Sequence, residues 1–226
     1  AAIGAVNAVA FDISAACAGF IFAMNIVEGF FKAGIYKTAL IIGAETLSKV
    51  TDWSDRGTCV LFGDGAGAAV LKAEETGIID MMMGADGTKG DVLACTSRTV
   101  GNFLTGTKPE LGFMTMDGQE VFKFAVRKVP ESVLELLNRT GTKKEDIKYY
   151  VLHQANERII EAAARRLKEP MEKFPMTISQ FGNTSTASIP LLLDDMIRKD
   201  MLKRGDKIIM SGFGAGMTWG AVLMEW

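Results

Sequence analysis

The stretch FDISAACAGF, residues 11–20, guides the interpretation of the whole chain. An apolar run typical of a strand, VNAVAF over residues 6–11, ends here, and small residues lead into Cys17. Apolar residues then recur every three or four positions, which predicts a helix over Ala16–Ala33 that Gly34 terminates. Cys17 is therefore expected where a strand gives way to the N-terminus of a helix.

A thiol at that position has a chemical interpretation and a structural one. Unpaired N–H groups and the helix dipole favour a thiolate at Cys17, small neighbours leave room for a ligand, and Gly19 lets another backbone approach. A similar strand–turn–helix geometry presents the nucleophile of α/β-hydrolases. The alternative is a space-filling core cysteine. Cys59 is expected in a buried strand, and Cys95 in a surface loop or at the core edge.

Composition narrows the class of protein. The chain has 226 residues, is 48% hydrophobic and carries a net charge of −2, which indicates a globular protein that binds neither nucleic acid nor membrane surfaces. No apolar run reaches the roughly 18 residues that suggest a membrane span. The first residues lack the basic region of a signal peptide. Three cysteines make no disulfide framework, so we expect a cytoplasmic protein.

Strands and helices alternate along the chain, which predicts an α/β fold with a mostly parallel sheet. The runs TALIIGAE, residues 38–45, and AGAAVLKA, residues 66–73, are expected to be strands, the first of them fully buried. Pro130 is expected to kink or break a helix. Further strands are expected at Tyr149–Leu152, Lys207–Ser211 and Ala221–Met224, and further helices at Asp117–Asn138, Asn156–Leu167 and Ser185–Arg198.

Two glycine-rich segments resemble each other, GDGAGAAVL over residues 63–71 and GFGAGMTWGAVLM over residues 212–224. We therefore expect two similar halves, residues 1–76 and 77–226, each closing with a strand, a glycine-rich turn and a strand. The first half is much shorter, so we expect that the front of this half is missing. The alternative is unequal halves that share only common Gly/Ala strand chemistry.

Two more residues stand at places where α/β proteins bind ligands. His153, the only histidine, follows a predicted strand and precedes a helix; a structural histidine fits that position equally well. Asn183 lies in GNTSTAS, where it could simply cap a helix, but so many small residues favour close approach of a ligand or backbone. The turn SGFGAGMTWG, residues 211–220, offers N–H groups for an oxyanion and lacks the lysine of a phosphate loop.

Cys, His and Asn occur in that order, as a nucleophile, a base and an orienting group do in papain-type peptidases. The interval between Cys17 and His153 also fits that family. The local sequence argues against it, because SAACAGF is not the peptidase signature around the nucleophile.

Six motifs together resemble β-ketoacyl-acyl carrier protein (ACP) synthase III, the thiolase-fold family that starts bacterial fatty-acid synthesis. They cover nearly the whole chain in the right order: DISAACAGF, DRGTCVLFGDGAGAAVL, MDGQEVFKFAVR, HQANERII, FGNTSTASIP and GFGAGMTWGAVLMEW. The resemblance implies a thiolase-like fold of two similar βαβ-type halves, with mostly parallel sheets packed in layers and the first half truncated.

The resemblance also implies catalytic roles. Cys17 would take the acyl group of an acyl-CoA, and His153 and Asn183 would hold the malonyl-ACP thioester while it loses CO₂. The backbone N–H groups of Cys17 and Ala215 would form an oxyanion hole. Phe213 would lie beside the cysteine.

Substrate contacts and partners follow from the same resemblance. Arg56 and Asn156 would contact CoA, and the basic patch Lys123, Arg158, Arg165 and Arg166 would dock acidic ACP; the alternative is an ordinary solvated helix face. A homodimer is implied, in which the strand near Val6–Ile13 pairs across the axis, with no cofactor, metal, nucleic acid or membrane. The alternatives are a polyketide-type condensing enzyme and an inactive fragment that only binds partners.

Overall fold

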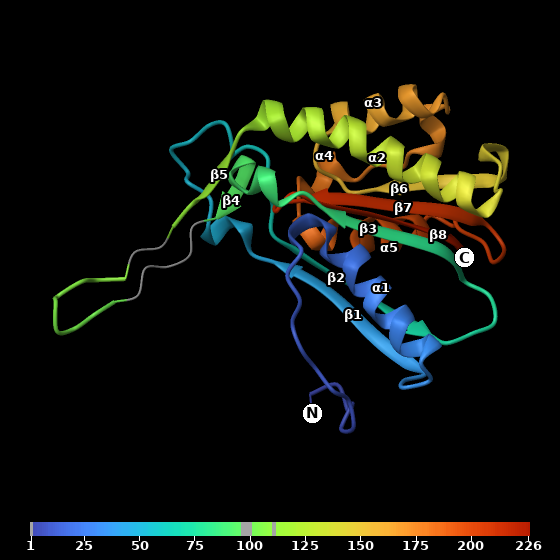
Figure 1. The fold of residues 1–226 in the computed structure, drawn as a ribbon, viewed down its shortest axis with the longest axis horizontal. Coiled ribbons are helices and arrows are strands. Elements are labelled where there is room, and N and C mark those ends of the chain that lie inside the picture. Colours follow the sequence, from blue (N-terminus) through green and yellow to red (C-terminus); the bar gives the residue numbers. More distant parts are fainter. Residues whose placement is uncertain (1, 96–100, 110–111) are drawn as a thin grey trace.

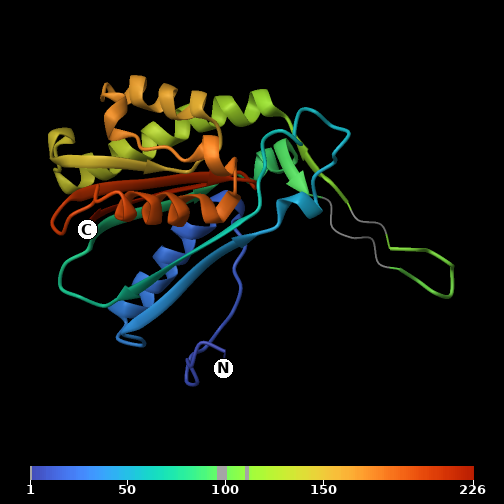
Figure 2. The same ribbon diagram turned by 180° about the vertical axis from the view of Figure 1, so that it is seen from behind.

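The computed structural model describes residues 2–95, 101–109 and 112–226, and these form stacked layers (Figure 1). Helices α2 (Gly118–Thr140) and α3 (Glu157–Leu167) cover one face of a four-stranded sheet. Helices α1 (Gly19–Lys32) and α5 (Ser188–Arg198) lie on its other face, between it and a two-stranded sheet, as the view from behind also shows (Figure 2). The predicted α/β class is confirmed.

The larger sheet has the order β3 (Ile78–Ala85), β8 (Thr218–Glu225), β7 (Lys207–Gly214) and β6 (Ile147–Leu152). Among the described strands only β6 and β7 pair in parallel, so the expectation of mostly parallel sheets is wrong for this part of the chain. The short turn after Gly214 imposes one antiparallel pair, because parallel neighbours need a long crossover.

The two smaller sheets are entirely antiparallel. One pairs β1 (Thr38–Glu45) with β2 (Gly65–Lys72), and the other pairs β4 (Leu93–Cys95) with β5 (Met114–Met116). Short helices connect the elements: η1 (Ala16–Ala18), η2 (Leu47–Lys49), η3 (Gly87–Val92), η4 (Lys144–Asp146), η5 (Met171–Lys173), α4 (Ile178–Phe181) and η6 (Ser185–Ala187).

The prediction that β1 is fully buried is wrong, because the described residues cover only one face of the β1–β2 sheet. The residues of β1 alternate, and Leu40 and Ile42 are 43% and 60% exposed. On the covered face Gly43 pairs with Gly67, and Cβ atoms there would meet the Thr186 carbonyl oxygen at 2.8 Å and Pro190 Cγ at 2.9 Å. The two glycines therefore let the Asn183-bearing segment lie directly on the sheet.

The expected strand over residues 6–11 does not form, and Val6, Val9 and Phe11 are exposed. A strand requires a neighbour that accepts and donates its backbone hydrogen bonds. No described strand pairs with this segment. The expectation that it is a strand is therefore wrong for this chain, and pairing across a dimer axis stays a prediction.

The buried strand expected around Cys59 does not form either: residues 56–61 form turns, and Cys59 is only half-buried. The remaining predicted elements form within a few residues of their expected bounds.

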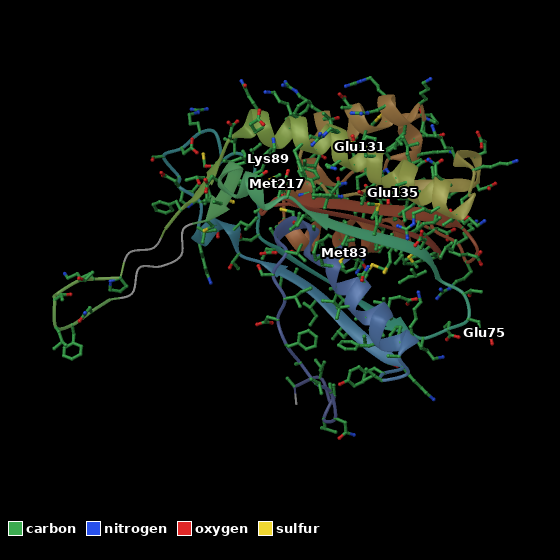
Figure 3. The ribbon with its side chains drawn as sticks, viewed as in Figure 1. Glu75, Met83, Lys89, Glu131, Glu135 and Met217 are labelled. Carbon is green, nitrogen blue, oxygen red and sulfur yellow. The ribbon has the colours of Figure 1, made fainter. Side chains whose placement is uncertain are left out.

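Pro130 lies inside α2 and does not break it. A proline removes the hydrogen bond to the carbonyl four residues earlier, here Val126. The Arg166 guanidinium, from α3, donates to that carbonyl at 3.3 Å. It also approaches Glu131, labelled in Figure 3, at 4.0 Å.

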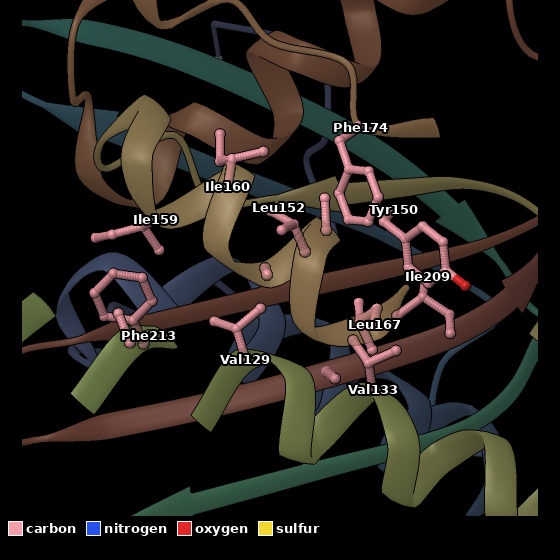
Figure 4. Close-up of a cluster of buried hydrophobic side chains, with 14 of the residues drawn as sticks. Val129, Val133, Tyr150, Leu152, Ile159, Ile160, Leu167, Phe174, Ile209 and Phe213 are labelled. Atoms are coloured by element: carbon pink, nitrogen blue, oxygen red, sulfur yellow. The ribbon is translucent and has the colours of Figure 1, made fainter. Parts of the chain in front are cut away.

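Two apolar cores hold the layers together, one on each face of the larger sheet. The α2–α3 side includes Val133, Ile160 and Phe174, and the ring of Phe174 stacks on Tyr150 with centroids 4.8 Å apart (Figure 4). The α1–α5 side includes Phe20 and Leu192. Successive residues of β6, β7 and β8 point alternately into the two cores, which fixes the register of the sheet.

Candidate active site

Cys17 lies in the turn η1, directly before α1. Ala16 has a left-handed backbone, φ 46°, which costs a residue with a Cβ roughly 1–2 kcal/mol. Two hydroxyls hold the turn: Thr186 Oγ1 donates to the Ala16 carbonyl at 2.7 Å, and Thr218 Oγ1 donates to the Ala15 carbonyl at 3.1 Å. The strained backbone is thus fixed from two segments far away in sequence.

Glycines provide the clearance around this turn. A Cβ on Gly214 would lie 2.6 Å from the Cys17 backbone nitrogen, so the glycine-rich turn reaches the nucleophile only without a side chain. Ala215 follows and is partly buried against the core. A Cβ on Gly19 would lie 2.8 Å from Thr186 Oγ1. Close approach at Gly19 was expected, but the neighbour is a side chain instead of a backbone.

Burial controls the acidity of the thiol. Desolvation raises the pKa of Cys17 to about 11, against a hydrogen bond from Ser185 that lowers it, while the charge of Glu45 raises it further. The expectation that the helix N-terminus favours a thiolate is therefore wrong for the free protein. Cys17 is 8% exposed and protonated near neutral pH.

One cavity of about 200 Å³ brings the three principal residues together, because Cys17, His153 and Asn183 all line it. Phe213 and Asn156 line it too. Much of the remaining wall is apolar: Leu61, Phe62, Leu93, Met116, Val121, Phe122, Ala155 and Ile159. Such a wall suits the apolar part of a ligand, with the few polar groups left to orient it.

His153 is held from three sides. Its backbone N–H donates to the Ser211 carbonyl at 2.8 Å, and its Nδ1 lies 2.6 Å from Ser188 Oγ. Its ring and that of Phe213 lie in a T-shaped arrangement, with centroids 5.5 Å apart. Burial lowers the pKa of His153 from 6.5 to about 3, so the imidazole is neutral over most of the pH range.

Asn183 is fixed by both its backbone and its side chain. Its N–H donates to the Leu61 carbonyl and its carbonyl accepts from the Gly63 N–H, each at 2.9 Å. Oδ1 accepts from the Ser185 N–H at 2.9 Å, two residues on, as in an Asx-turn. Thr184 and Ala187 precede the two helices that follow, so Asn183 is not the helix cap considered above. With the oxygen occupied, the Nδ2 group is the part of the amide suited to donate to a ligand.

Arg56 and Asn156 are placed differently with respect to the cavity. Arg56 is exposed and lies beside the cavity-lining Gly57, but it does not itself line the cavity. Asn156 caps α3, since its Oδ1 accepts from the Arg158 N–H at 2.9 Å.

The structure brings together only two of the four predicted docking cations. Lys123 and Arg158 line a shallow pocket that shares Phe122 and Asn156 with the main cavity. Arg165 lies outside it, 3.6 Å from Glu161, and Arg166 is engaged with α2. Lys123 also contacts Glu120 at 2.9 Å.

Sequence reasoning missed the hydroxyls around the site, namely Ser185, Thr186, Ser188 and Thr218. The available signal was the unusual density of small polar residues in GNTSTAS, but their partners are distant in sequence.

Among the described residues there is no cluster of metal ligands, and none of the described helices has the length and apolarity to cross a membrane.

The layered fold, with a buried cysteine, a histidine and an asparagine lining one cavity, is typical of thiolase-fold condensing acyltransferases. Two family models match the chain: 3-oxoacyl-[acyl-carrier-protein] synthase III over residues 11–87, and the C-terminal model of the same family over residues 137–226. The chain belongs to the β-ketoacyl-ACP synthase III family.

Relatives named beta-ketoacyl-[acyl-carrier-protein] synthase III agree. The protein of Clostridium acetobutylicum is 51% identical over 226 residues, and that of Clostridium novyi is 52% identical over 227 residues. These matches cover 99% and 100% of this chain and 70% of each relative. This chain therefore spans about 70% of the relatives' length.

Solved structures confirm the thiolase-like fold. The 3-oxoacyl-[acyl-carrier-protein] synthase III of Aquifex aeolicus matches with a TM-score of 0.90 at 44% identity, covering 100% of this chain and 70% of that one. The Pseudomonas aeruginosa enzyme gives 0.93 at 39% identity, covering 99% and 70%. The priming β-ketosynthase of the R1128 polyketide pathway gives 0.90 at 35% identity, covering 99% and 67%.

Proposed function

We propose that this chain condenses an acyl group from acyl-CoA with malonyl-ACP, giving 3-oxoacyl-ACP, CoA and CO₂. One observation carries the proposal: Cys17, His153 and Asn183 line a single, largely apolar cavity. Two thioester substrates would use that cavity in turn, with the cysteine holding the acyl group in between.

In the first half-reaction Cys17 Sγ attacks the acyl-CoA carbonyl, and CoA leaves with the thiol proton. The N–H groups of Cys17 and Ala215 are proposed to stabilise the oxyanion. The close approach of Gly214 to the Cys17 nitrogen supports this pairing. Phe213 would border the acyl group.

In the second half-reaction the malonyl thioester oxygen accepts hydrogen bonds from His153 and Asn183. Their donation stabilises the enolate that forms as CO₂ leaves. The enolate carbon then attacks the acyl carbonyl and Cys17 leaves as a thiolate, which takes a proton from the solvent. A neutral imidazole fits the role of His153, because one of its ring nitrogens carries a proton and can donate a hydrogen bond while the ring stays uncharged.

The docking surfaces complete the proposal. Arg56 and Asn156 would contact CoA at the rim of the cavity. Lys123 and Arg158, which line the pocket beside the cavity, would bind an acidic carrier protein. We extend the proposal to a cytoplasmic homodimer without cofactor. A polyketide-type primer enzyme is the second candidate, favoured by the similarity to the R1128 ketosynthase; the carrier protein that supports turnover separates the two.

Labelled acetyl-CoA tests the proposal directly. We expect label on Cys17 that disappears in Cys17→Ser and persists in Cys95→Ser, a matched control at an exposed cysteine. Adding malonyl-ACP should then release the label as 3-oxoacyl-ACP. Labelling that is unaffected by Cys17→Ser, or no labelling at all, contradicts the proposal and favours the binding-fragment alternative.

A further inference from the structure

The hydroxyl of Ser188 is the closest polar neighbour of His153, and it comes from a different element. Ser188 begins α5, whereas His153 follows β6, and their Oγ and Nδ1 atoms are 2.6 Å apart. Both side chains are buried, each 2% exposed, so water does not compete for this contact. The distance alone leaves open which of the two atoms donates.

A second hydrogen bond settles the direction. The Gln154 N–H donates to the same Ser188 Oγ at 3.3 Å. Gln154 cannot turn away, because its Nε2 donates to the Leu152 carbonyl at 2.8 Å and its Oε1 accepts from the Thr177 N–H at 2.9 Å. The serine oxygen therefore already accepts one hydrogen bond.

If Nδ1 carried the histidine proton, Ser188 Oγ would accept twice and its own proton would need another acceptor. Within the part of the chain that the structure describes, that hydroxyl has no hydrogen-bond partner besides His153 and Gln154. A buried donor without a partner is unfavourable. The consistent arrangement has the Ser188 O–H donating to Nδ1.

We propose that Ser188 is a positioning residue that holds His153 in the tautomer with its proton on Nε2. The inference rests on the proposed function, since it gives His153 the cavity-facing donor that the enolate step needs. Ser188 touches no substrate in this account. Its effect passes entirely through the orientation and protonation of the imidazole.

The chain offers an unusually clean test, because His153 is its only histidine. With ¹⁵N-labelled imidazole, the two ring nitrogens give one pair of NMR signals for this residue. We expect the proton on Nε2 in the wild-type protein. In Ser188→Ala the tautomers should mix, and malonyl-ACP decarboxylation should fall about 10- to 100-fold, as when the partner of a metal-bound histidine is removed.

Acylation of Cys17 by acetyl-CoA should remain unchanged in Ser188→Ala, and Ser188→Thr should restore decarboxylation. Thr140→Ala is the control, since the Thr140 hydroxyl is also partly buried but donates within α2, to the Leu136 carbonyl at 2.8 Å. It should leave the His153 signals as in the wild type.

A proton on Nδ1 in the wild-type protein would overturn the proposal, even if Ser188→Ala fails to fold. So would a Ser188→Ala protein with an unchanged tautomer and an unchanged decarboxylation rate. If the wild-type protein neither acylates Cys17 nor decarboxylates malonyl-ACP, the proposed function is wrong. The NMR spectrum would still show which ring nitrogen of His153 carries the proton.

Discussion

Cys17 must be nucleophilic, yet burial raises its pKa to about 11. Between pH 7 and pH 10 the thiolate fraction should therefore rise about tenfold per pH unit. We expect the alkylation rate of Cys17 by iodoacetamide, followed by peptide mass spectrometry, to rise in the same way. A rate that levels off below pH 8 would show that the helix N-terminus outweighs burial after all.

The proposed roles assign His153 to the second half-reaction alone. We expect His153→Ala to abolish malonyl-ACP decarboxylation, a loss of at least about 10²-fold, and to leave Cys17 acylation largely intact. Both half-reactions can be followed separately, by CO₂ release and by label on the protein. Loss of both would show that His153 also activates the thiol.

The buried, neutral imidazole also makes stability depend on pH. In the unfolded chain the histidine takes up a proton near pH 6.5, whereas in the fold its pKa is about 3. Between these values the unfolded state binds more protons, so stability falls as the pH is lowered from 6.5 toward 3, by up to about 1.4 kcal/mol per unit.

Urea unfolding at a series of pH values measures this loss. His153→Gln should flatten the curve between pH 6.5 and pH 4 relative to the wild type. Identical slopes for the two proteins would mean that His153 does not contribute.

At the scale of elements, Pro130 and Arg166 form one unit that joins α2 to α3. Arg166→Ala leaves the Val126 carbonyl without its donor, and we expect a loss of about 1 kcal/mol in unfolding free energy. Arg165→Ala, the exposed neighbour, should be nearly neutral.

A double-mutant cycle isolates the cause. Pro130→Ala supplies a backbone N–H to Val126, so Arg166→Ala should cost less in that background. Equal costs with and without the proline would assign the effect to packing or to Glu131.

The elements that the sequence predicted well are those whose pattern reflects one local environment. The apolar spacing of α1 lies within a single stretch, and the starts of α2 and α3 are fixed by residues directly beside them, since Asp117 and Asn156 cap those helices. The exposure of β1 depends on what covers its second face, which the run TALIIGAE does not encode. The segment over residues 6–11 has a strand pattern but no described partner strand.

At the scale of the whole molecule, the basic patch divides into two parts. Lys123 and Arg158 flank the pocket beside the cavity, whereas Arg165 and Arg166 do not. We expect Arg158→Glu to raise the KM for malonyl-ACP at least about tenfold at low salt. The reason is that charges at a docking surface mainly affect how fast the two proteins associate and have less effect on the chemical step. Arg165→Glu is the control and should change KM little.

Measuring KM at two ionic strengths completes that test. The effect of Arg158→Glu should shrink at high salt, because screening weakens the attraction. Equal effects of the two variants would favour docking over the whole helix.

The sequence singled out the three principal residues that line the cavity, because each stands at a strand or helix end and small residues surround Cys17 and Asn183. It did not single out their supporting hydroxyls. Ser188 lies 35 residues from His153, and Thr186 lies 170 residues from Ala16. No spacing rule connects groups that meet only after the layers have packed.

The two threonine clamps on the turn before Cys17 have a consequence for biosynthesis. Both arise from the C-terminal part of the chain, and one of them begins the last strand, β8. A growing chain therefore carries a chemically ordinary cysteine until that strand docks. Only then does the clamped turn hold Cys17 in the cavity that His153 and Asn183 also line, so the nucleophile is assembled late in folding.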